Sequence, residues 1–172
     1  PELITTLENR NGWWRDTAGR LIVERGGTDA LPGLRALLRE SDWDVARLHA
    51  LYAIAGLGEL EESDLNLALS DISAGLREHG LKLYREEFTN LRGRLFELAI
   101  DGNVRVRFQS ALALGDLGGA EVASALAKMS IRDAANQWIR FAILSARPDT
   151  AFDVFWELKN QTHQSSLFEP LA

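Results

Sequence analysis

Apolar residues recur at helical spacing along this chain, and an arginine interrupts the pattern about every thirty residues. The arginines are Arg15, Arg47, Arg77, Arg107 and Arg140, which lie 32, 30, 30 and 33 residues apart. A small residue follows each of the first four by three positions, and a large apolar or aromatic residue follows by seven. These two positions share one helical face, where a small residue lets a neighbouring helix approach closely. A fixed period of this length predicts a repeated pair of helices that buries its apolar face against its neighbours.

The repeat divides the chain into helical hairpins. Gly or Pro residues suited to helix ends follow most of the arginine-bearing helices, and a second amphipathic segment then begins, at about 29–40, 62–70, 89–100, 120–129 and 150–159. The predicted units are 11–42, 43–72, 73–102, 103–133 and 134–160. Residues 1–9 look like the second helix of an earlier unit, and residues 161–172 lack periodicity and are predicted to be a C-terminal tail. We therefore expect an all-α fold, a right-handed α-α superhelix of about five hairpins over residues 1–160.

Two units carry an additional signature. Asp71 precedes Arg77 by six residues and Asp101 precedes Arg107 by six, in each case with a small residue three after the arginine. Together with the segment 101–119, DGNVRVRFQSALALGDLGG, this spacing resembles the HEAT repeat, notably the variety described in phycobilisome lyases. The resemblance implies an α-solenoid whose second helices line an extended surface.

The same spacing predicts a ladder of charges. An aspartate just before a helix can accept hydrogen bonds from the free N–H groups of the first turn. The arginine one turn further on is expected to reach that carboxylate and the carboxylate of the next unit. The ladder residues would be Arg15, Arg47, Asp71, Arg77, Asp101, Arg107 and Arg140. Three units depart from the spacing of six: Asp42 stands five before its arginine, Asp133 stands seven before, and the first unit has Asn11 four before.

A narrower resemblance covers residues 8–158. It rests on NGWWRDTAGRLIVERGG at 11–27, ARLHALYAIAGLG at 46–58, LREHGLKL at 76–83 and VRVRFQSALALGDLG at 104–118. This succession resembles the helical-repeat region of large membrane-bound dehydrogenases of planctomycetes and related bacteria, where the region separates a β-propeller similar to sugar dehydrogenases from a C-terminal cytochrome c module. The resemblance implies an exported or periplasmic multidomain redox protein. Because the chain begins with Pro1 and contains neither module, we expect it to be an excised piece of such a protein.

Composition narrows the classes of function. The formal net charge of −6 argues against nucleic-acid binding, because a phosphate backbone is recognised by a basic stripe. No run of about 18 apolar residues occurs, so we expect no direct membrane insertion. The absence of cysteine excludes disulfides, thiolate catalysis, Cys-ligated zinc and covalently attached c-type haem within these residues.

A polar column is the first candidate for chemistry. His49, His79 and Gln109 each stand two residues after an arginine, so they share one face of successive helices. The column could form a metal or proton-relay site, or a row of hydrogen-bonding groups. We favour the second interpretation, because packed helices lie about 8–10 Å apart, whereas each imidazole on zinc needs a Zn–N distance of about 2.1 Å.

Tryptophan and acidic residues supply two further candidates. Trp14, Trp138 and Trp156 occupy apolar helical positions and are predicted to pack structurally, whereas Trp13 and Trp43 lie nearer the turns and are the predicted binding surface. An acidic corner is formed by Glu59, Glu61, Glu62 and Asp64. A cation site would require a convergent loop of oxygen ligands, so we interpret the corner as solvated helix caps.

The sequence contains none of the common catalytic motifs, neither a Gly-x-Ser-x-Gly elbow, nor a phosphate loop, nor His-Glu-x-x-His. We therefore expect a non-catalytic scaffold, without catalytic residue, metal or cofactor, that binds proteins or adjacent domains of its parent chain. The alternative is a HEAT-fold enzyme subunit, either a phycobilin lyase with an aromatic groove or a DNA glycosylase with a basic one. A third hypothesis is self-association, in which the exposed apolar ends of the stack, residues 1–9 and 134–160, pair two copies into a dimer.

Overall fold

The computed structural model describes residues 2–166, with side chains as far as residue 160, and all regular structure in that part of the chain is helical. The elements are α1 Glu2–Thr6, α2 Gly12–Arg25, η1 Thr28–Ala30, α3 Leu31–Glu40, α4 Asp44–Gly56, α5 Glu62–Leu69, α6 Ala74–Leu83, η2 Thr89–Leu91, α7 Arg92–Leu98, α8 Val104–Leu117, α9 Ala120–Arg132, α10 Gln137–Leu144 and α11 Pro148–Ser166. The predicted all-α fold is confirmed, and each of the five predicted units contains two α-helices in order.

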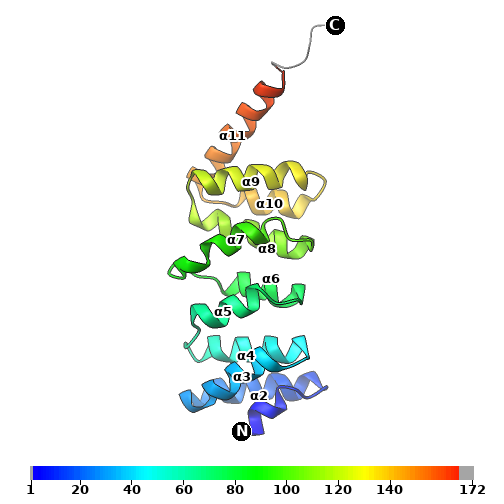
Figure 1. Cartoon of the computed structure of the whole chain (residues 1–172), viewed down its shortest axis with the longest axis vertical. Coiled ribbons are helices and arrows are strands. Elements are labelled where there is room, and N and C mark those ends of the chain that lie inside the picture. The colour runs from blue at the N-terminus through cyan, green and yellow to red at the C-terminus, as the bar shows by residue number, and fades with distance from the viewer. Residues whose placement is uncertain (1, 167–172) are drawn as a thin grey trace. The chain divides into compact units, whose positions relative to one another are not determined.

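The chain divides after Leu91 into two compact units, and Figure 1 shows the order of the helices in each. In the first unit the arginine-bearing helices α2, α4 and α6 pack one against the next. The helices α1, α3 and α5 form a second layer, in which α3 contacts α1, α4 and α5. The short α1 therefore lies where the second helix of a preceding hairpin would lie.

The second unit repeats this two-layered arrangement. Helix α8 packs against α7, α9 and α10, and α11 packs along α9. The arginine-bearing helices α8 and α10 thus form one layer, and α9 and α11 form the other. Gly115 in α8 permits a close approach, because a Cβ atom there would lie 3.0 Å from the Cβ atom of Ala146, just before α11. The Gly115 carbonyl also accepts a hydrogen bond from the backbone N–H of Arg147 at 3.2 Å.

The core lies between the layers of each unit and follows the predicted columns. The small residues three after the arginine are buried, as Ala18, Ala50 and Ser110 illustrate. Of the residues seven after it, Ile22, Ile54 and Leu114 are buried as well, whereas Tyr84 is only half-buried. Each fully buried Leu or Ile side chain contributes about 1.5–3 kcal/mol relative to exposure. Each unit is therefore held mainly by apolar contacts, and the polar loops determine the register of its helices.

Helix ends are specified by asparagine and glycine. Asn11, Asn103 and Asn136 are N-caps whose side-chain oxygens accept backbone N–H groups of the first turn. Gly26 ends α2 in the left-handed conformation at φ 64°, which glycine adopts without a steric penalty. Where a glycine break is missing, after α6, the chain turns through an extended Tyr84 and an irregular corner before η2.

Helix α11 extends beyond the predicted hairpin. It continues to Ser166, so residues 161–166 of the predicted tail are helical. The prediction rested on the loss of apolar periodicity after residue 160, and a polar sequence can continue a helix that is already nucleated. The rest of the predicted tail, residues 167–172, lies outside the described residues.

Candidate functional site

The loops that precede the arginine-bearing helices share one hydrogen-bonding pattern. In four of these loops, the residue six before the arginine accepts a hydrogen bond through its side-chain oxygen. The donor is the backbone N–H of the residue two positions further along the chain. The four bonds are Asn9 with Asn11 at 2.9 Å, Ser41 with Trp43 at 3.3 Å, Asp71 with Ser73 at 2.7 Å and Asp101 with Asn103 at 2.7 Å. The spacing of six therefore holds in the first two units as well, where Asn9 and Ser41 stand in place of aspartate.

Each of these loops is also bound by its own arginine. The Nη1 atom of Arg107 donates to the carbonyl oxygens of Asp101 and Gly102 at 2.9 and 3.2 Å. Arg47 donates in the same way to the Ser41 carbonyl at 2.6 Å, and Arg77 to the Asp71 carbonyl at 2.7 Å. This differs from the predicted bond within a unit, because these Nη1 bonds go to the backbone carbonyl of the residue six before the arginine. The carbonyl projects towards the first helical turn, and the side chain of that residue folds back onto its own loop.

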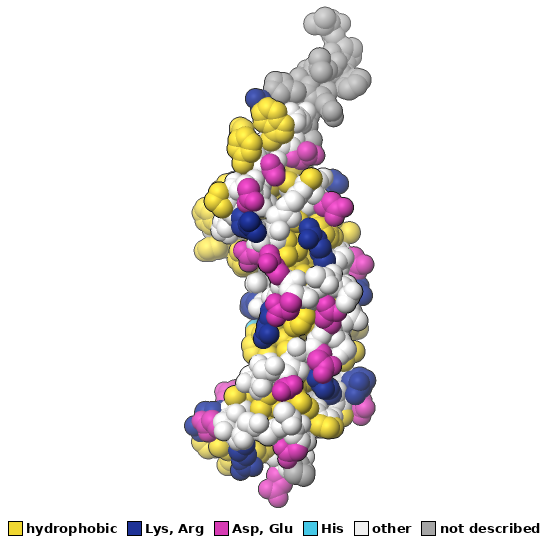
Figure 2. Space-filling view, turned by 90° about the vertical axis from the view of Figure 1, so that its left-hand side faces the viewer, with side chains coloured by type: hydrophobic (Ala, Val, Ile, Leu, Met, Phe, Trp, Pro, Cys, Tyr) yellow, Lys and Arg dark blue, Asp and Glu magenta, His cyan; other side chains and the backbone are white. Residues whose placement is uncertain are grey.

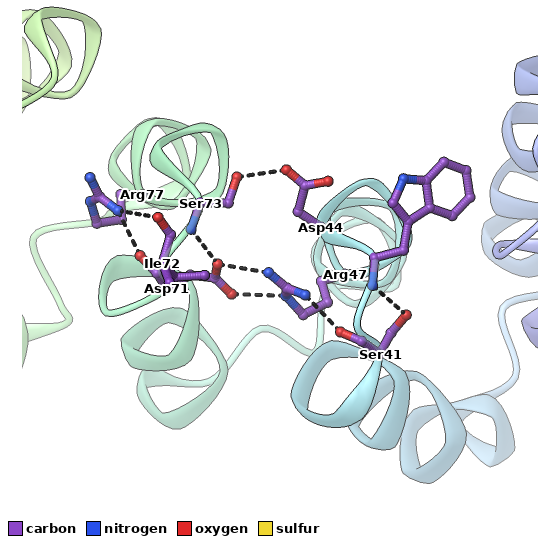
Figure 3. A network of polar contacts seen from close by, with 8 residues as sticks. Ser41, Asp44, Arg47, Asp71, Ile72, Ser73 and Arg77 are labelled. Carbon is purple, nitrogen blue, oxygen red and sulfur yellow. Dashed lines mark hydrogen bonds and ion pairs between the residues drawn. The ribbon is translucent and has the colours of Figure 1, made fainter.

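Two arginines form buried ion pairs with the loop of the next unit. Arg47 contacts both carboxylate oxygens of Asp71, from Nε and Nη2 at 2.8 Å each, and Figure 3 shows this fork between α4 and the start of α6. Arg107 forms the same fork with Asp133, from Nε at 3.0 Å and Nη2 at 2.5 Å. The hydrogen bond to Asp133 raises the pKa of Arg107 above its ordinary value, against the opposing effect of burial.

A further hydrogen bond holds two helix N-termini in register in the compact unit that ends at Leu91. The Ser73 hydroxyl donates to the carboxylate of Asp44 at 2.8 Å, which joins the N-termini of α4 and α6 (Figure 3). Arg140 differs from the other ladder residues, since it is exposed on α10 and forms no ion pair within the described residues.

Arg15 has a different environment, which we call the Trp43 cluster and define as Arg10, Arg15, Trp43 and His49. The guanidinium groups of Arg10 and Arg15 lie 4.8 and 4.9 Å from the centre of the Trp43 ring. Arg15 also donates from Nε to Nε2 of His49 at 3.2 Å. The predicted binding residue Trp43 is thus half-buried and contacted by two cations.

The histidine column forms hydrogen bonds, as the sequence predicted for His49 and His79. Burial and the neighbouring Arg15 lower the pKa of His49, and Asp16 at 4.0 Å opposes this shift. The hydroxyl of Tyr52 lies 2.8 Å from Nδ1 of His79, and burial raises the pKa of that tyrosine. Within the described residues no group of three or more His, Cys, Asp or Glu side chains could hold a metal ion.

The tryptophans are more exposed than predicted. Trp13 is 62% exposed at the first turn of α2 and lies edge-on to Trp14, with ring centres 4.7 Å apart. Trp14, Trp138 and Trp156, which were expected to pack in the core, are also exposed. Trp14 and Trp138 lie in the first turn of their helices, before the position at which the buried face begins. Figure 2 shows further hydrophobic side chains at the surface of α11, below the grey residues.

The acidic corner contains a buried ion pair that the sequence analysis missed. Asp64 is 2% exposed and accepts Nε and Nη2 of Arg35, both at 3.0 Å, in addition to the backbone N–H of Glu61. Arg35 lies on α3, the preceding helix of the same layer, and the hydrogen bond to Asp64 raises the pKa of Arg35. The corner does cap α5, but its central aspartate is buried and not solvated. The sequence feature that could have indicated this ion pair is the 29-residue interval between Arg35 and Asp64, which is close to the repeat length.

An apolar groove of about 690 Å³ lies in the second unit beside α9. Its lining includes Phe96, Ile100, Ala125, Lys128 and Met129. Phe96 is the one aromatic residue in its lining. The groove belongs to the layer of second helices, the layer that the resemblance to HEAT repeats implies for binding.

Comparison with known proteins gives no family. No model of a known protein family matches the chain, and a search of curated proteins found no significant match. Within the described part of the chain, no helix combines the length and hydrophobicity needed to cross a membrane. The molecule is thus defined as an all-α helical-repeat protein by its fold.

Proposed function

We propose that this chain is a HEAT-like helical-repeat scaffold that binds a protein partner or adjacent domains of a larger redox protein, and that it does not catalyse a reaction. The observation that carries the proposal is the exposure of large aromatic residues on helices whose other faces are buried. In the first unit these are Trp13 and Trp14, and in the second Trp138 and Phe141. Exposed aromatic groups on a rigid support are typical of protein-binding surfaces.

The loops strengthen this proposal. The forks of Arg47 and Arg107 connect the start of one arginine-bearing helix to the loop before the next. Such links hold side chains on successive helices at fixed spacing, so little conformational entropy is lost when a partner binds across them. A scaffold that sets the distance between two redox modules needs this property.

The proposal is tested by measuring association with the modules that the resemblance implies. Purified chain is titrated by calorimetry with a β-propeller module and, separately, a cytochrome c module of the dehydrogenases it resembles. We expect micromolar or tighter binding to one of them, reduced at least tenfold by the pair of changes Trp13→Ala and Trp14→Ala. Both residues are exposed, so the variant should retain the circular dichroism of the native chain. Absence of association with either module would contradict the interdomain role.

The alternative is tested in parallel. A lyase subunit would give a saturable change in the absorption spectrum of added bilin, and a glycosylase would release a base from alkylated DNA. The apolar groove beside α9 is the place where a bilin would be expected to bind, and Ile100→Lys, at an exposed position of its lining, would then abolish the spectral change. Either activity would replace the scaffold proposal.

A further inference from the structure

Arg47 and Arg107 show how a ladder arginine uses its guanidinium group. Each directs Nη1 to carbonyl oxygens of its own loop and presents Nε and Nη2 as a fork to a carboxylate of the next loop. Arg15 also directs Nη1 to its own loop, to the carbonyls of Asn9 and Arg10 at 2.7 and 3.0 Å. Its Nε donates to His49, and its Nη2 has no hydrogen-bond acceptor among the described residues. Arg15 therefore holds a ladder position without a carboxylate on its fork.

The cause is the residue in the next loop. Ser41 stands six residues before Arg47, as Asp71 stands six residues before Arg77. Serine has no carboxylate, and the hydroxyl of Ser41 is already engaged, because it accepts from the backbone N–H of Trp43 and donates to Glu8 at 2.7 Å. No internal acid therefore takes the place on Arg15 that Asp71 takes on Arg47.

The surroundings favour an anion at this position. Arg10 places a second guanidinium group on the same Trp43 ring, so two cations share one aromatic contact. The acids nearby do not form an ion pair with either arginine among the described residues: Glu8 accepts from Ser41, and Asp16 lies 4.0 Å from His49. A carboxylate bound at Nη2 of Arg15 would reduce the repulsion between the two guanidinium groups, and by displacing His49 from Nε it would form bidentate charge-assisted bonds.

We propose that the Trp43 cluster binds a carboxylate of an acidic segment of a protein partner, in the manner in which Arg47 binds Asp71. This inference rests on the proposed scaffold function and specifies the chemistry of the partner. A protein segment is favoured over a free anion because the cluster combines two cations with the half-buried ring of Trp43, which offers apolar contact area beside the charges. A neutral or basic segment would leave both cations without a counter-charge.

The test is an NMR titration of the intact, ¹⁵N-labelled chain. The probe is a capped seven-residue peptide of alternating Gly and Glu, and the control is the same peptide with Gln for Glu. We expect saturable shifts of the Arg15 Nε–H and Trp43 indole N–H signals with the Glu peptide alone. Arg15→Lys should weaken binding at least tenfold, since lysine keeps the charge and loses the fork. Arg20→Lys, an equivalent change at an exposed position of the same helix, should not alter the affinity.

A second variant restores an internal partner. Ser41→Asp places a carboxylate where Asp71 stands in the next loop, and Glu8→Gln is added so that two carboxylates do not face each other. We expect this double variant to lose peptide binding at least tenfold and to melt at a higher temperature, because the introduced carboxylate would occupy the fork of Arg15. Glu8→Gln alone should retain binding. Unchanged peptide affinity in the double variant would overturn the proposal.

The remaining outcomes separate this inference from the scaffold proposal. Equal shifts with the Glu and Gln peptides, or no saturable shift with either, would overturn the assignment of a carboxylate site. Acetate or inorganic phosphate binding as tightly as the peptide would also overturn it, since the cluster would then be a small-anion site. If a redox module binds the chain with the same affinity after Arg15→Lys, the scaffold function stands and the Trp43 cluster is not its contact.

Discussion

Replacement of Asp71 by alanine is the most direct test of how the loops stabilise the stack. The carboxylate of Asp71 accepts two bonds from Arg47 at 2.8 Å and one from the Ser73 backbone N–H at 2.7 Å. The side chains of Arg47 and Asp71 are only 11% and 12% exposed. Asp71→Ala therefore leaves a guanidinium group largely out of water, with one remaining acceptor, the Ser41 carbonyl.

The size of the effect follows from this burial. Removal of one partner from a buried ion pair costs about 3–5 kcal/mol. Because about a tenth of the Arg47 side chain still contacts water, we expect the lower end, a loss of about 3 kcal/mol in the free energy of unfolding. For a chain of this length such a loss lowers the melting temperature by about 6–12 °C.

The assay is urea unfolding of the intact chain, followed by circular dichroism at about 222 nm, where helical backbone absorbs. The matched control is Glu24→Ala, which breaks an exposed i,i+4 pair with Arg20 and should cost no more than about 0.5 kcal/mol. Arg47→Met combined with Asp71→Ala should be less destabilising than Asp71→Ala alone, since no charge is then left buried. A loss below about 1 kcal/mol for Asp71→Ala, or a double variant as unstable as the sum of the single variants, would refute the reasoning.

Three further predictions concern other parts of the molecule. The pKa of His49 is lower in the folded chain than its ordinary value of 6.5, so the unfolded chain binds a proton more readily as the pH falls. The free energy of unfolding should therefore fall between about pH 7.5 and 5.5. Urea unfolding at both pH values should show a smaller fall for His49→Asn. Gly115→Ala should destabilise by about 1 kcal/mol because its Cβ would lie 3.1 Å from the Cα atom of Ala146, whereas Gly93→Ala meets nothing within 4 Å and should be neutral or slightly stabilising; equal melting temperatures would contradict the close approach. Leu144 is 73% exposed, whereas Leu51, which also stands four residues after an arginine, is fully buried. We therefore expect a second copy of the chain to cover Leu144 at high concentration. Light scattering should show a dimer that Leu144→Glu dissociates, and a monomer at millimolar concentration would exclude this dimer.

Much of the fold could be predicted because one repeat constrains many residues at once. The columns three and seven after each arginine identified core positions such as Ala50 and Ile54 without any knowledge of tertiary structure. Side-chain roles at helix starts were harder to predict. A search for aspartate alone missed that Asn9 and Ser41 form the same turn, although both residue types also accept backbone N–H groups in such turns.

The remaining differences arise from contacts between helices that apolar periodicity does not encode. The burial of Asp64 depends on Arg35, which reaches it from the neighbouring helix. The exposure of Trp138 depends on whether a neighbouring helix extends over the first turn of α10, and helix ends are the least regular part of a hairpin. Apolar periodicity tells which face of a helix is buried, but not where along the helix the burial begins.

In the compact unit that ends at Leu91, the loop position six residues before an arginine therefore determines what the preceding arginine does; in the other unit Asp133, seven before Arg140, takes the role of Asp71. Where that position holds aspartate, as at Asp71, the arginine fork of the previous helix is closed within the molecule and its energy goes into stability. Where it holds serine, as at Ser41, the fork has no carboxylate and lies beside an aromatic ring; its Nε donates to His49, and its Nη2 remains available for binding. Stability and recognition then compete for the same donors. This is why a gain in melting temperature with Ser41→Asp should accompany a loss of peptide binding, and why an increase in both would be inconsistent with a single shared fork.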